Sequence, residues 1–338
     1  METLLSFVII AYNESNNIGR TLDAITSLAG LGDYEVIVVN DGSRDRTADI
    51  VKSLAAADPH IKLIDLPRNR GRGYARSAGI AAAEGSLVAT VDADILLPAD
   101  WFARAEAALD GCDAVGGTAV PDGDVAYLFR ATRLVPRVVG HTTAVTGSNA
   151  LYRRQVFDVV AFDPSLREGE DVALNQATTV HGLSFATVPG LLVEHIENKT
   201  FLESLRWLFT SGMGASRQLL VYREVRVPDI AAGAFWLGLA AGIGLAVTVS
   251  PLALLIPVAL LAATGAQHVR SRFETPLRRW RAVIAATAID CTLLLAYFCG
   301  RLIGLSWLVR RRSGNRGTGP RSGPVSDARD VSSLPQPR

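Results

Sequence analysis

This chain of 338 residues has few cysteines and almost no net charge. The three cysteines, Cys112, Cys291 and Cys299, have neither the spacing of metal ligands nor that of a disulfide framework, which favours a reducing compartment. The 34 basic and 33 acidic residues leave a formal net charge of +1. Because no basic groove interleaved with aromatic residues is visible either, no nucleic-acid partner is expected. We also find no internal repeat, and no charged n-region or cleavage site of a signal peptide before the first apolar run.

Charged side chains are absent from residues 230–266, a stretch interrupted by Pro251 and Pro257. At about 1.5 Å of helix rise per residue, this stretch is too long for one membrane crossing and predicts a helical hairpin that turns near Ser250. A second apolar segment, residues 282–309, carries two charged side chains, Asp290 and Arg301. The sequence therefore predicts a multi-pass membrane protein.

Arginine placement predicts how the membrane region is oriented. The turn near Ser250 has no arginine, whereas the loop between the two apolar segments has five: Arg270, Arg272, Arg278, Arg279 and Arg281. Under the positive-inside rule this loop is cytoplasmic, and so is the N-terminal domain two crossings earlier. A crossing by residues 282–309 would place Arg310–Arg312 outside, against the rule, so two and three crossings both stay open. The chain beyond Arg310 is rich in Arg, Gly, Ser and Pro and is expected to be disordered.

Acidic residues follow three apolar, β-branched runs in the N-terminal half of the chain. The runs, residues 7–10, 36–39 and 87–91, are typical of buried strands in a parallel sheet with helices between them. Ligands of open α/β sheets bind at the carboxyl ends of the strands, so we expect the three clusters to meet in one crevice. The clusters are Ala11-Tyr12-Asn13-Glu14, Asp41-Gly42-Ser43 and Asp92-Ala93-Asp94.

Asp92 and Asp94 form the most informative of these clusters. Side chains at positions i and i+2 of an extended chain point the same way, so both carboxylates can face one cation. Mg²⁺ or Mn²⁺ prefers such oxygens, and a bound cation can stabilise the charge that develops on a departing diphosphate. The alternative is a loop or helix cap, because a helical pattern begins soon afterwards at Pro98-Ala99-Asp100.

Six motifs over roughly the first two hundred residues resemble, in their order, those of the family 2 inverting glycosyltransferases. They are Val8-Ile9-Ile10-Ala11-Tyr12-Asn13-Glu14, Val39-Asn40-Asp41-Gly42-Ser43, Asn69-Arg70-Gly71-Arg72-Gly73-Tyr74-Ala75-Arg76, Val91-Asp92-Ala93-Asp94, Gly147-Ser148-Asn149 and Glu168-Gly169-Glu170-Asp171. The resemblance implies an α/β domain of the GT-A fold, in which a mostly parallel sheet is flanked by helices. It also implies a nucleotide-sugar donor and a Mg²⁺ or Mn²⁺ cofactor.

The resemblance assigns the first two clusters to donor binding. Family members contact the base and ribose at the positions of Tyr12, Glu14 and Asp41, and a carboxylate can accept from a ring N–H or a sugar hydroxyl. The family often has Pro where this chain has Ala11. A turn that caps the following helix is the alternative for the second cluster, and Ser43 can cap while Asp41 binds.

Further positions are assigned to the diphosphate and the metal. Arg72 lies between two glycines, where the family commonly has Lys, and a cation before a helix start suits phosphate. The alternative is a solvated arginine, like its neighbours Arg68, Arg70 and Arg76.

Asp94 is expected to bind the metal directly, and Asp92 to contact the ribose or to reach the metal through water. A late histidine completes the metal site of many such enzymes, and His195 follows an apolar run, although a histidine at a strand end is more often structural.

The acceptor side is assigned to the last two motifs. An acceptor hydroxyl must lose a proton as it attacks the anomeric carbon, and a carboxylate within reach can take that proton. The resemblance gives this role to Asp171, with Glu170 in support, at the start of an amphipathic stretch over residues 172–180. Acidic residues also favour the first helical turn for dipole reasons alone. Ser148 and Asn149 are expected to line the wall near the donor sugar and the acceptor.

The segment that precedes the apolar hairpin is expected to lie on the membrane surface. Apolar residues recur at helical spacing over residues 201–220, with tryptophan and arginine alongside them, although an ordinary helix packed on the core is the alternative. The expected organisation is a catalytic domain over residues 1–199, an interfacial region over 200–228, a membrane region over 229–309 and a basic tail over 310–338.

A lipid or a lipid-linked sugar is the expected acceptor, and two alternatives stay open. Polyprenyl-phosphate mannosyl and glucosyl transferases usually carry Asp-x-Asp-Leu-Gln, whereas Ile95-Leu96-Leu97 follows Asp94 here, which favours a hydroxyl acceptor. A processive polysaccharide synthase is disfavoured, because Glu203 stands where its Gln-x-x-Arg-Trp motif has Gln. A sugar-phosphate nucleotidyltransferase would need a Gly-rich first loop with Arg. Intact Asp92, Asp94 and Asp171 argue against a non-catalytic scaffold.

Overall fold

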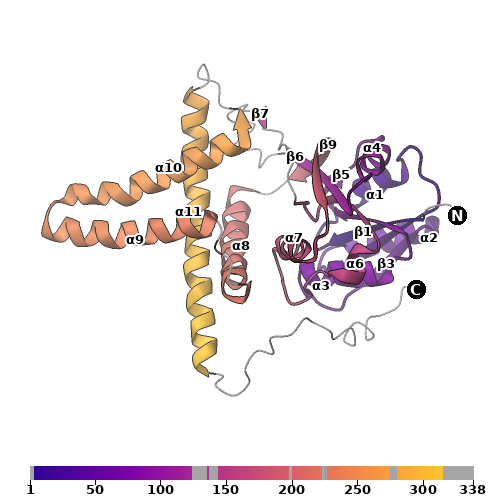
Figure 1. The fold of residues 1–338 in the computed structure, drawn as a ribbon, viewed down its shortest axis with the longest axis horizontal. Coiled ribbons are helices and arrows are strands. Elements are labelled where there is room, and N and C mark those ends of the chain that lie inside the picture. Colours follow the sequence, from indigo (N-terminus) through magenta and orange to yellow (C-terminus); the bar gives the residue numbers. More distant parts are fainter. Residues whose placement is uncertain are drawn as a thin grey trace. The chain divides into compact units, whose positions relative to one another are not determined.

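The computed structural model describes residues 4–123, 135–136, 144–197, 200–222, 225, 227–274 and 280–314. These residues form two compact units (Figure 1). Among the described residues, the first unit is built from the chain up to Asp122 and from 144 to Ile196, and the second holds Gly123, 135–136 and the chain from Glu197 to Gly314.

The first unit is a layered α/β domain. Its elements are β1 (Leu5–Ala11), α1 (Ile18–Thr26), β2 (Tyr34–Asn40), α2 (Thr47–Ala57), β3 (Ile61–Asp65), α3 (Arg72–Ala82), β4 (Leu87–Asp92), β5 (Ile95–Leu96), α4 (Trp101–Ala108), β6 (Ala114–Gly123), β8 (Asn149–Arg153), α6 (Val156–Val159), α7 (Glu170–His181) and β9 (Phe185–Glu197). The strands form one sheet in the order β3-β2-β1-β4-β8-β6-β9-β5. Strands β3, β2, β1 and β4 are parallel, while β8 pairs antiparallel with both β4 and β6. The predicted, mostly parallel GT-A sheet is confirmed.

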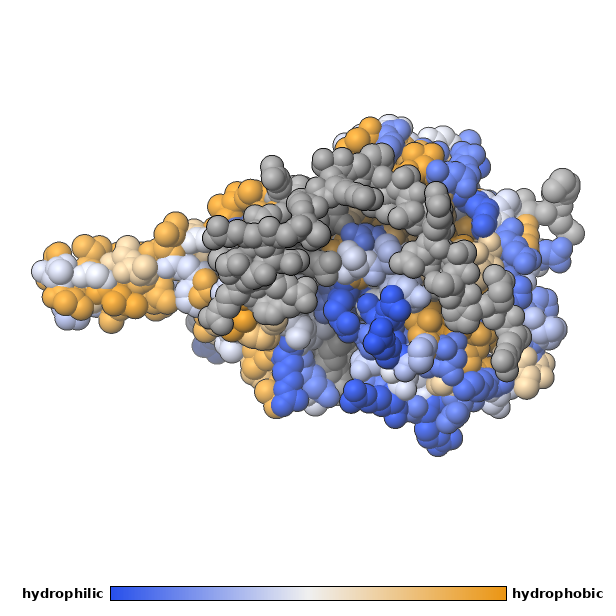
Figure 2. Space-filling view, turned by 90° about the horizontal axis from the view of Figure 1, so that it is seen from below, coloured by the Kyte–Doolittle hydropathy of each residue, from blue (hydrophilic) through white to orange (hydrophobic). Residues whose placement is uncertain are grey.

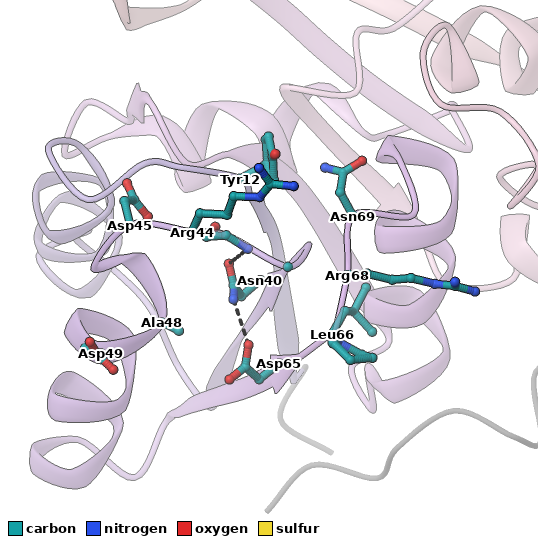
Figure 3. Close-up of a pocket in the computed structure, with 13 residues that line it drawn as sticks. Tyr12, Asn40, Arg44, Asp45, Ala48, Asp49, Asp65, Leu66, Arg68 and Asn69 are labelled. Carbon is teal, nitrogen blue, oxygen red and sulfur yellow. Dashed lines mark hydrogen bonds between the residues drawn. The ribbon is translucent and has the colours of Figure 1, made fainter.

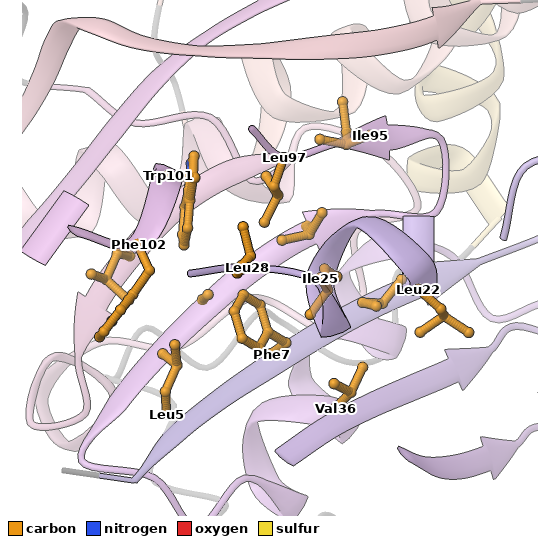
Figure 4. Packing of buried hydrophobic residues seen from close by; sticks show 14 of the residues in the cluster. Leu5, Phe7, Leu22, Ile25, Leu28, Val36, Ile95, Leu97, Trp101 and Phe102 are labelled. Atoms are coloured by element: carbon orange, nitrogen blue, oxygen red, sulfur yellow. The ribbon is translucent and has the colours of Figure 1, made fainter. Parts of the chain in front are cut away.

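Strand β1 shows why the sheet is buried on both faces. Alternate side chains of a strand point to opposite faces. Phe7 and Ile9 join α1 and α4 in one core, in which Trp101 is fully buried (Figure 4). Val8 and Ile10 pack on the other face against helix α3. A continuous apolar run is therefore required, because each face of β1 is covered by helices.

The three predicted strands end at one edge of the sheet, as expected. Ile10 pairs with Asp92 across β1 and β4, and Ala11 pairs with Asn40 across β1 and β2. The last residue of β3, Asp65, pairs in turn with Asn40. The residues that follow these strands therefore lie along the same edge.

The second unit is mainly helical. It contains β7 (Val135–Pro136), α8 (Phe201–Tyr222), α9 (Val227–Thr248), a 3₁₀ turn (Pro251–Leu254), α10 (Leu255–Arg272), β10 (Phe273–Glu274) and α11 (Trp280–Gly314). Three stretches among the described residues are long and apolar enough to cross a membrane, namely Pro228–Thr248, Pro251–Ser271 and Trp280–Ser306. The predicted hairpin is thus present, and its turn falls at Ser250. Figure 2 shows that most of the visible surface of α9 and α10 is hydrophobic.

The end of the last helix differs from the sequence-based expectation. Helix α11 continues through Arg310–Arg312 to Gly314, so the chain is not disordered directly after residue 309. The remainder of the expected basic tail, residues 315–338, lies outside the described residues.

Glu203, which stands where the synthase motif has Gln, accepts hydrogen bonds from the backbone N–H and the hydroxyl of Thr200 at the start of α8. This reciprocal cap stabilises the first turn of the helix.

The charged residues inside the apolar helices are paired with one another. Arg301 of α11 forms an ion pair with Asp229 of α9, and both side chains are almost completely buried. The carboxylate of Asp290 in α11 lies 2.8 Å from Nδ1 of His268 in α10. Ionisable groups in apolar surroundings are costly unless they are paired, so these contacts account for their presence in membrane-type segments. They also tie both legs of the hairpin to α11.

Breaking one of these pairs should destabilise the second unit. We expect Arg301→Leu to leave Asp229 buried without its counter-ion, a change that costs about 3–5 kcal/mol in buried pairs. The midpoint of thermal unfolding of the full chain in detergent should fall clearly. The double variant Asp229→Asn/Arg301→Leu should recover most of the loss, while Arg281→Leu, which removes an exposed charge from the same helix, should have little effect. A stable Arg301→Leu variant would contradict the inferred importance of the pair.

Candidate active site

The loops after β1 and β2 are joined by side-chain hydrogen bonds. Asn13 donates its backbone N–H to Ser43 Oγ at 2.9 Å and accepts the N–H of Arg44 at 2.8 Å. Glu14 donates its N–H to Thr47 Oγ1, and its carboxylate accepts from Asn17. Ser43 is therefore used to hold the first loop and does not cap α2, which begins only at Thr47. The two predicted clusters therefore do lie together, and some of their polar groups bond one another across the two loops.

A pocket of about 430 Å³ lies at the carboxyl ends of β1, β2 and β3. Figure 3 shows its lining, with the side chains of Asn40 and Asp65 pointing toward one another. The lining residues come from the ends of β2 and β3, the loops after β1, β2 and β3, and the start of α2: Tyr12, Asn40, Gly42, Ser43, Arg44, Asp45, Ala48, Asp49, Asp65, Leu66, Pro67, Arg68 and Asn69. Tyr12 is the predicted donor-binding residue whose exposed ring, 41 % accessible, contributes to this lining.

Asp41 does not line the pocket but holds the loop after β3 in place. Its two carboxylate oxygens accept the backbone N–H groups of Arg70 at 2.6 Å and Gly71 at 2.9 Å. Burial raises the pKa of the Asp41 carboxyl, although these two hydrogen bonds act in the opposite direction. Its own N–H donates to the carbonyl of Ala11, which is itself buried. Asp41 and Ala11 therefore fix the loops around the pocket.

The two glycines around Arg72 serve the packing of the backbone. Helix α3 begins at Arg72, and the N–H groups of Arg72 and Gly73 already donate to the carbonyls of Arg167 and Leu166. A Cβ on Gly73 would lie 2.1 Å from the carbonyl oxygen of Asp163, and Gly71 has a φ of 97°. The first two N–H groups of this helix are thus used by another loop of the chain and are not open to a phosphate. The Arg72 side chain, half exposed, instead lies 3.6 Å from Asp92.

Asp92 is held by arginines. Its Oδ1 accepts from Nη2 of Arg76 at 2.6 Å, and its Oδ2 faces Arg72. Burial tends to raise the pKa of the Asp92 carboxyl, but the charges of Arg72 and Arg76 lower this pKa overall. The sequence predicts that Asp92 and Asp94 share a cation. The structure offers another role for Asp92, because two guanidinium groups already balance the charge of its carboxylate.

Asp94 and His195 are brought together from distant parts of the chain. His195 lies within β9 rather than after a strand, and β9 pairs with β5 in the register that sets His195 opposite Ile95. As a result Nε2 of His195 lies 3.0 Å from Oδ2 of Asp94. The described residues contain no group of three or more His, Cys, Asp or Glu side chains arranged to hold a metal. Asp94 and His195 nevertheless supply one oxygen and one nitrogen donor side by side.

Asp171 and Glu170 begin helix α7, and each has a different partner. Oδ2 of Asp171 accepts the N–H of Gly147 at 3.3 Å, so the fifth and sixth motifs are adjacent. Glu170 is buried, and its Oε1 accepts from Nε of Arg76 at 2.9 Å. Ser148, which follows Gly147 directly, is partly exposed. Asp171 is thus the more accessible of the two carboxylates.

Asn149 has a structural position. Its side chain is fully buried, its Oδ1 accepts from the indole N–H of Trp101 at 2.8 Å, and its Nδ2 donates to the carbonyl of Leu191. Both ends of the amide are therefore used inside the domain. This differs from the expectation that Asn149 lines the wall facing the donor sugar.

Sequence reasoning overlooked Arg76. Its position among several arginines suggests a solvated side chain, but this side chain is 1 % exposed and bonds both Asp92 and Glu170. A signal was present in the helical spacing, since Arg76 follows Arg72 by one turn and shares the buried stripe of α3 with Ala75 and Gly79. An arginine on the apolar face of a helix needs carboxylates to balance it.

Comparison with known proteins identifies the family. Residues 6–160 match the family model described as glycosyl transferase family 2. The succinoglycan biosynthesis protein ExoO of Rhizobium meliloti (strain 1021) is 30 % identical over 244 residues, which cover 65 % of this chain and 68 % of that protein. The chain belongs to glycosyltransferase family 2. It is a nucleotide-sugar-dependent glycosyltransferase of this family, as its motifs predicted.

Other relatives extend this picture. The undecaprenyl-phosphate 4-deoxy-4-formamido-L-arabinose transferase of Pseudomonas fluorescens (strain SBW25) is 30 % identical over 260 residues, covering 69 % of this chain and 76 % of that protein. A transferase of the same name from Enterobacter sp. (strain 638) is matched over only 50 % of its length. Among solved structures, the mannosyltransferase PcManGT from Pyrobaculum calidifontis, in complex with GDP-Man and Mn²⁺, has a TM-score of 0.56 and 22 % identity. It covers 90 % of this chain and 87 % of its own, and the likeness concerns the fold.

Proposed function

We propose that this protein is a membrane-bound, inverting transferase that moves a sugar from a nucleotide-sugar donor to a lipid or a lipid-linked sugar. One observation carries the proposal. At one edge of the sheet, Asp94 lies beside His195, and Asp171 lies beside Gly147 at the start of α7. A single arginine connects the strand that leads to Asp94 with the helix that begins at Glu170. A metal-assisted leaving group and a base for the acceptor need such neighbouring sites.

The nucleoside of the donor is assigned to the pocket at the ends of β1, β2 and β3. Tyr12 offers an exposed ring for a base, and Asn40 and Asp65 offer polar atoms. The lining carries two arginines, Arg44 and Arg68, and three aspartates, Asp45, Asp49 and Asp65, so it offers donors for phosphate oxygens and acceptors for hydroxyls and ring N–H groups. In this assignment Ala11, Glu14 and Asp41 act indirectly, because their hydrogen bonds hold the loops of the pocket in place.

The donor diphosphate is assigned to the edge near Asp94 and His195. Mg²⁺-type sites often use one or two protein ligands, with substrate phosphate oxygens and water completing the shell. A pair of neighbouring donors fits such a site, and the imidazole nitrogen favours Mn²⁺ over Mg²⁺. When bound, the cation would neutralise charge on the departing diphosphate. Asp92 would orient Arg72 and Arg76 rather than ligate directly, since both arginines lie against its carboxylate.

The acceptor proton is assigned to Asp171. Its carboxylate is partly exposed, and the N–H of Gly147 fixes one of its oxygens while the helix start fixes its backbone. For a hydroxyl acceptor, Asp171 would take the proton as the oxygen attacks the anomeric carbon from the face opposite the diphosphate. Glu170 would remain paired to Arg76 and would not exchange protons with the acceptor.

Two acceptor classes compete within this proposal. The sequence after Asp94 favours a hydroxyl on a lipid or lipid-linked sugar, and ExoO is named for succinoglycan biosynthesis. The relative from Pseudomonas fluorescens is named for undecaprenyl phosphate, which supports a polyprenyl phosphate as the second candidate. The apolar helices of the second unit support either class, because both acceptors reside in a membrane. We further propose that the catalytic domain faces the cytoplasm, as the arginine-rich loop predicts.

Filling the nucleoside pocket should weaken nucleotide binding. Ala48 lines the pocket from α2, so the indole of Ala48→Trp should occupy space that the nucleotide needs. We expect the affinity of the full chain for UDP or GDP with Mn²⁺, whichever the wild type binds, to fall at least about tenfold, or ~1.4 kcal/mol. Isothermal titration in detergent measures this change. Ala56→Trp adds the same ring on an exposed position of the same helix and should bind normally. Equal affinities for both variants would remove the nucleotide from this pocket.

A further inference from the structure

Arg76 occupies a different environment from the other arginines near the site. It follows Arg72 by one turn of α3, yet its side chain is 1 % exposed whereas that of Arg72 is 50 % exposed. Nη2 of Arg76 donates to Asp92 Oδ1 at 2.6 Å, and Nε donates to Glu170 Oε1 at 2.9 Å. One guanidinium therefore joins the end of β4 to the start of α7, which are 78 residues apart by their numbers, 92 and 170.

Two neighbours lie close to this guanidinium. Cζ of Arg76 lies 5.7 Å from the centroid of the Phe162 ring. On another side is Gly147, where an added Cβ would lie 2.8 Å from both Cζ and Nη2 of Arg76. Gly147 also donates its N–H to Asp171. The same glycine thus contacts the guanidinium and the carboxylate that we assign as the base.

We propose that Arg76 is a positioning residue for glycosyl transfer. By binding Asp92 and Glu170 with separate N–H groups, it sets the distance between the donor side of the site and the helix start that carries Asp171. The planar guanidinium has donors in a fixed fork, whereas a lysine ammonium is a point charge that cannot hold two carboxylates in the same geometry. Gly147 keeps the space that this geometry requires. The inference rests on the roles proposed above for Asp94 and Asp171.

The expected signature is a loss of turnover without a loss of donor binding. The nucleoside pocket lies at β1, β2 and β3, and its lining includes neither Arg76 nor Gly147. Disturbing the bridge should therefore leave nucleotide affinity nearly unchanged. Turnover should fall, because a misplacement of about 1 Å can cost on the order of 10²-fold in rate.

Gly147→Ala tests this with one added methyl group and no change of charge. In the full chain we expect kcat to fall about 10²-fold, while affinity for UDP or GDP with Mn²⁺ stays within roughly threefold, or about 0.65 kcal/mol. Donor turnover is followed as UDP release from UDP-glucose and GDP release from GDP-mannose, with a lipid-linked sugar present as the hydroxyl acceptor. Gly32→Ala is the matched control, because no atom lies within 4 Å of its added Cβ. The control should match the wild type in both measurements.

Arg76→Lys gives a second route that adds no bulk beside Gly147. It should show the same split between turnover and nucleotide affinity. The double variant Arg76→Lys/Gly147→Ala should be no slower than the slower single variant, because residues that act through one group are not additive. Full turnover in Gly147→Ala, additive losses, or a parallel loss of nucleotide affinity would each overturn the inference. If Asp171→Asn itself kept wild-type turnover on a hydroxyl acceptor, the proposed function would fail instead.

Discussion

Asp94→Ala should abolish sugar transfer while leaving the fold intact. The substitution removes the carboxylate that lies 3.0 Å from His195, and with it the oxygen ligand of the proposed cation. Metal assistance supplies several kcal/mol of transition-state stabilisation, and each ~1.4 kcal/mol changes a rate tenfold, so turnover should fall by about 10³-fold or more. The dependence of nucleotide binding on added Mn²⁺ should also disappear. Titration of UDP and GDP with and without Mn²⁺ measures this second effect.

The control for this experiment is a variant of a nearby carboxylate that lies outside the candidate site. Asp100 is exposed and pairs with Arg104 one helical turn away, so Asp100→Ala should keep both turnover and metal dependence. Treating the wild type with a chelator should reproduce the loss seen in Asp94→Ala. A variant of Asp94 that retained near-normal, metal-dependent turnover would remove this residue from the mechanism.

Local sequence patterns predicted much of the fold because they follow from burial. The run Val36–Val39 is apolar throughout, and the structure covers both faces of the strand it forms. The length of the uncharged stretch from Ile230 to Ala266 predicted a hairpin of apolar helices, and the turn at Ser250 is stabilised by its own side chain, which accepts the N–H of Leu252. Such patterns need no knowledge of distant contacts.

The proximity of the candidate residues was partly predictable from topology. Parallel strands end at the same edge of a sheet, so the clusters after β1, β2 and β4 had to lie near one another. The pairing of β5 with β9 did not follow from any local pattern, because β5 has two residues. The contact between Asp94 and His195 depends on that pairing.

Individual side-chain roles were the least predictable, because one motif can contain residues with different surroundings. Asn149 follows Ser148 directly, yet its amide is used by Trp101 and Leu191 within the domain. Arg76 looked like its exposed neighbours in the sequence, but Asp92 and Glu170 converge on it from other elements. These assignments depend on tertiary partners, which the spacing within a motif does not specify.

Asp171→Asn should separate the two acceptor classes. The amide keeps the size of the side chain and can still accept from the N–H of Gly147, but it cannot take a proton at neutral pH. Donor binding should survive, because the nucleoside pocket and the pair formed by Asp94 and His195 lie on other elements. With a hydroxyl acceptor, turnover should fall by about 10²–10⁴-fold, which is the usual contribution of a positioned base.

A polyprenyl phosphate gives a different expectation for the same variant. Its attacking oxygen is already anionic, so no proton has to move and the loss should be far smaller. The measurement compares turnover of Asp171→Asn on undecaprenyl phosphate with turnover on a lipid-linked sugar. Gln176→Asn, a change of one methylene on a partly exposed position of the same helix, is the matched control. Wild-type turnover of Asp171→Asn on a proven hydroxyl acceptor would exclude Asp171 as the base, because no other step in this mechanism uses its carboxylate.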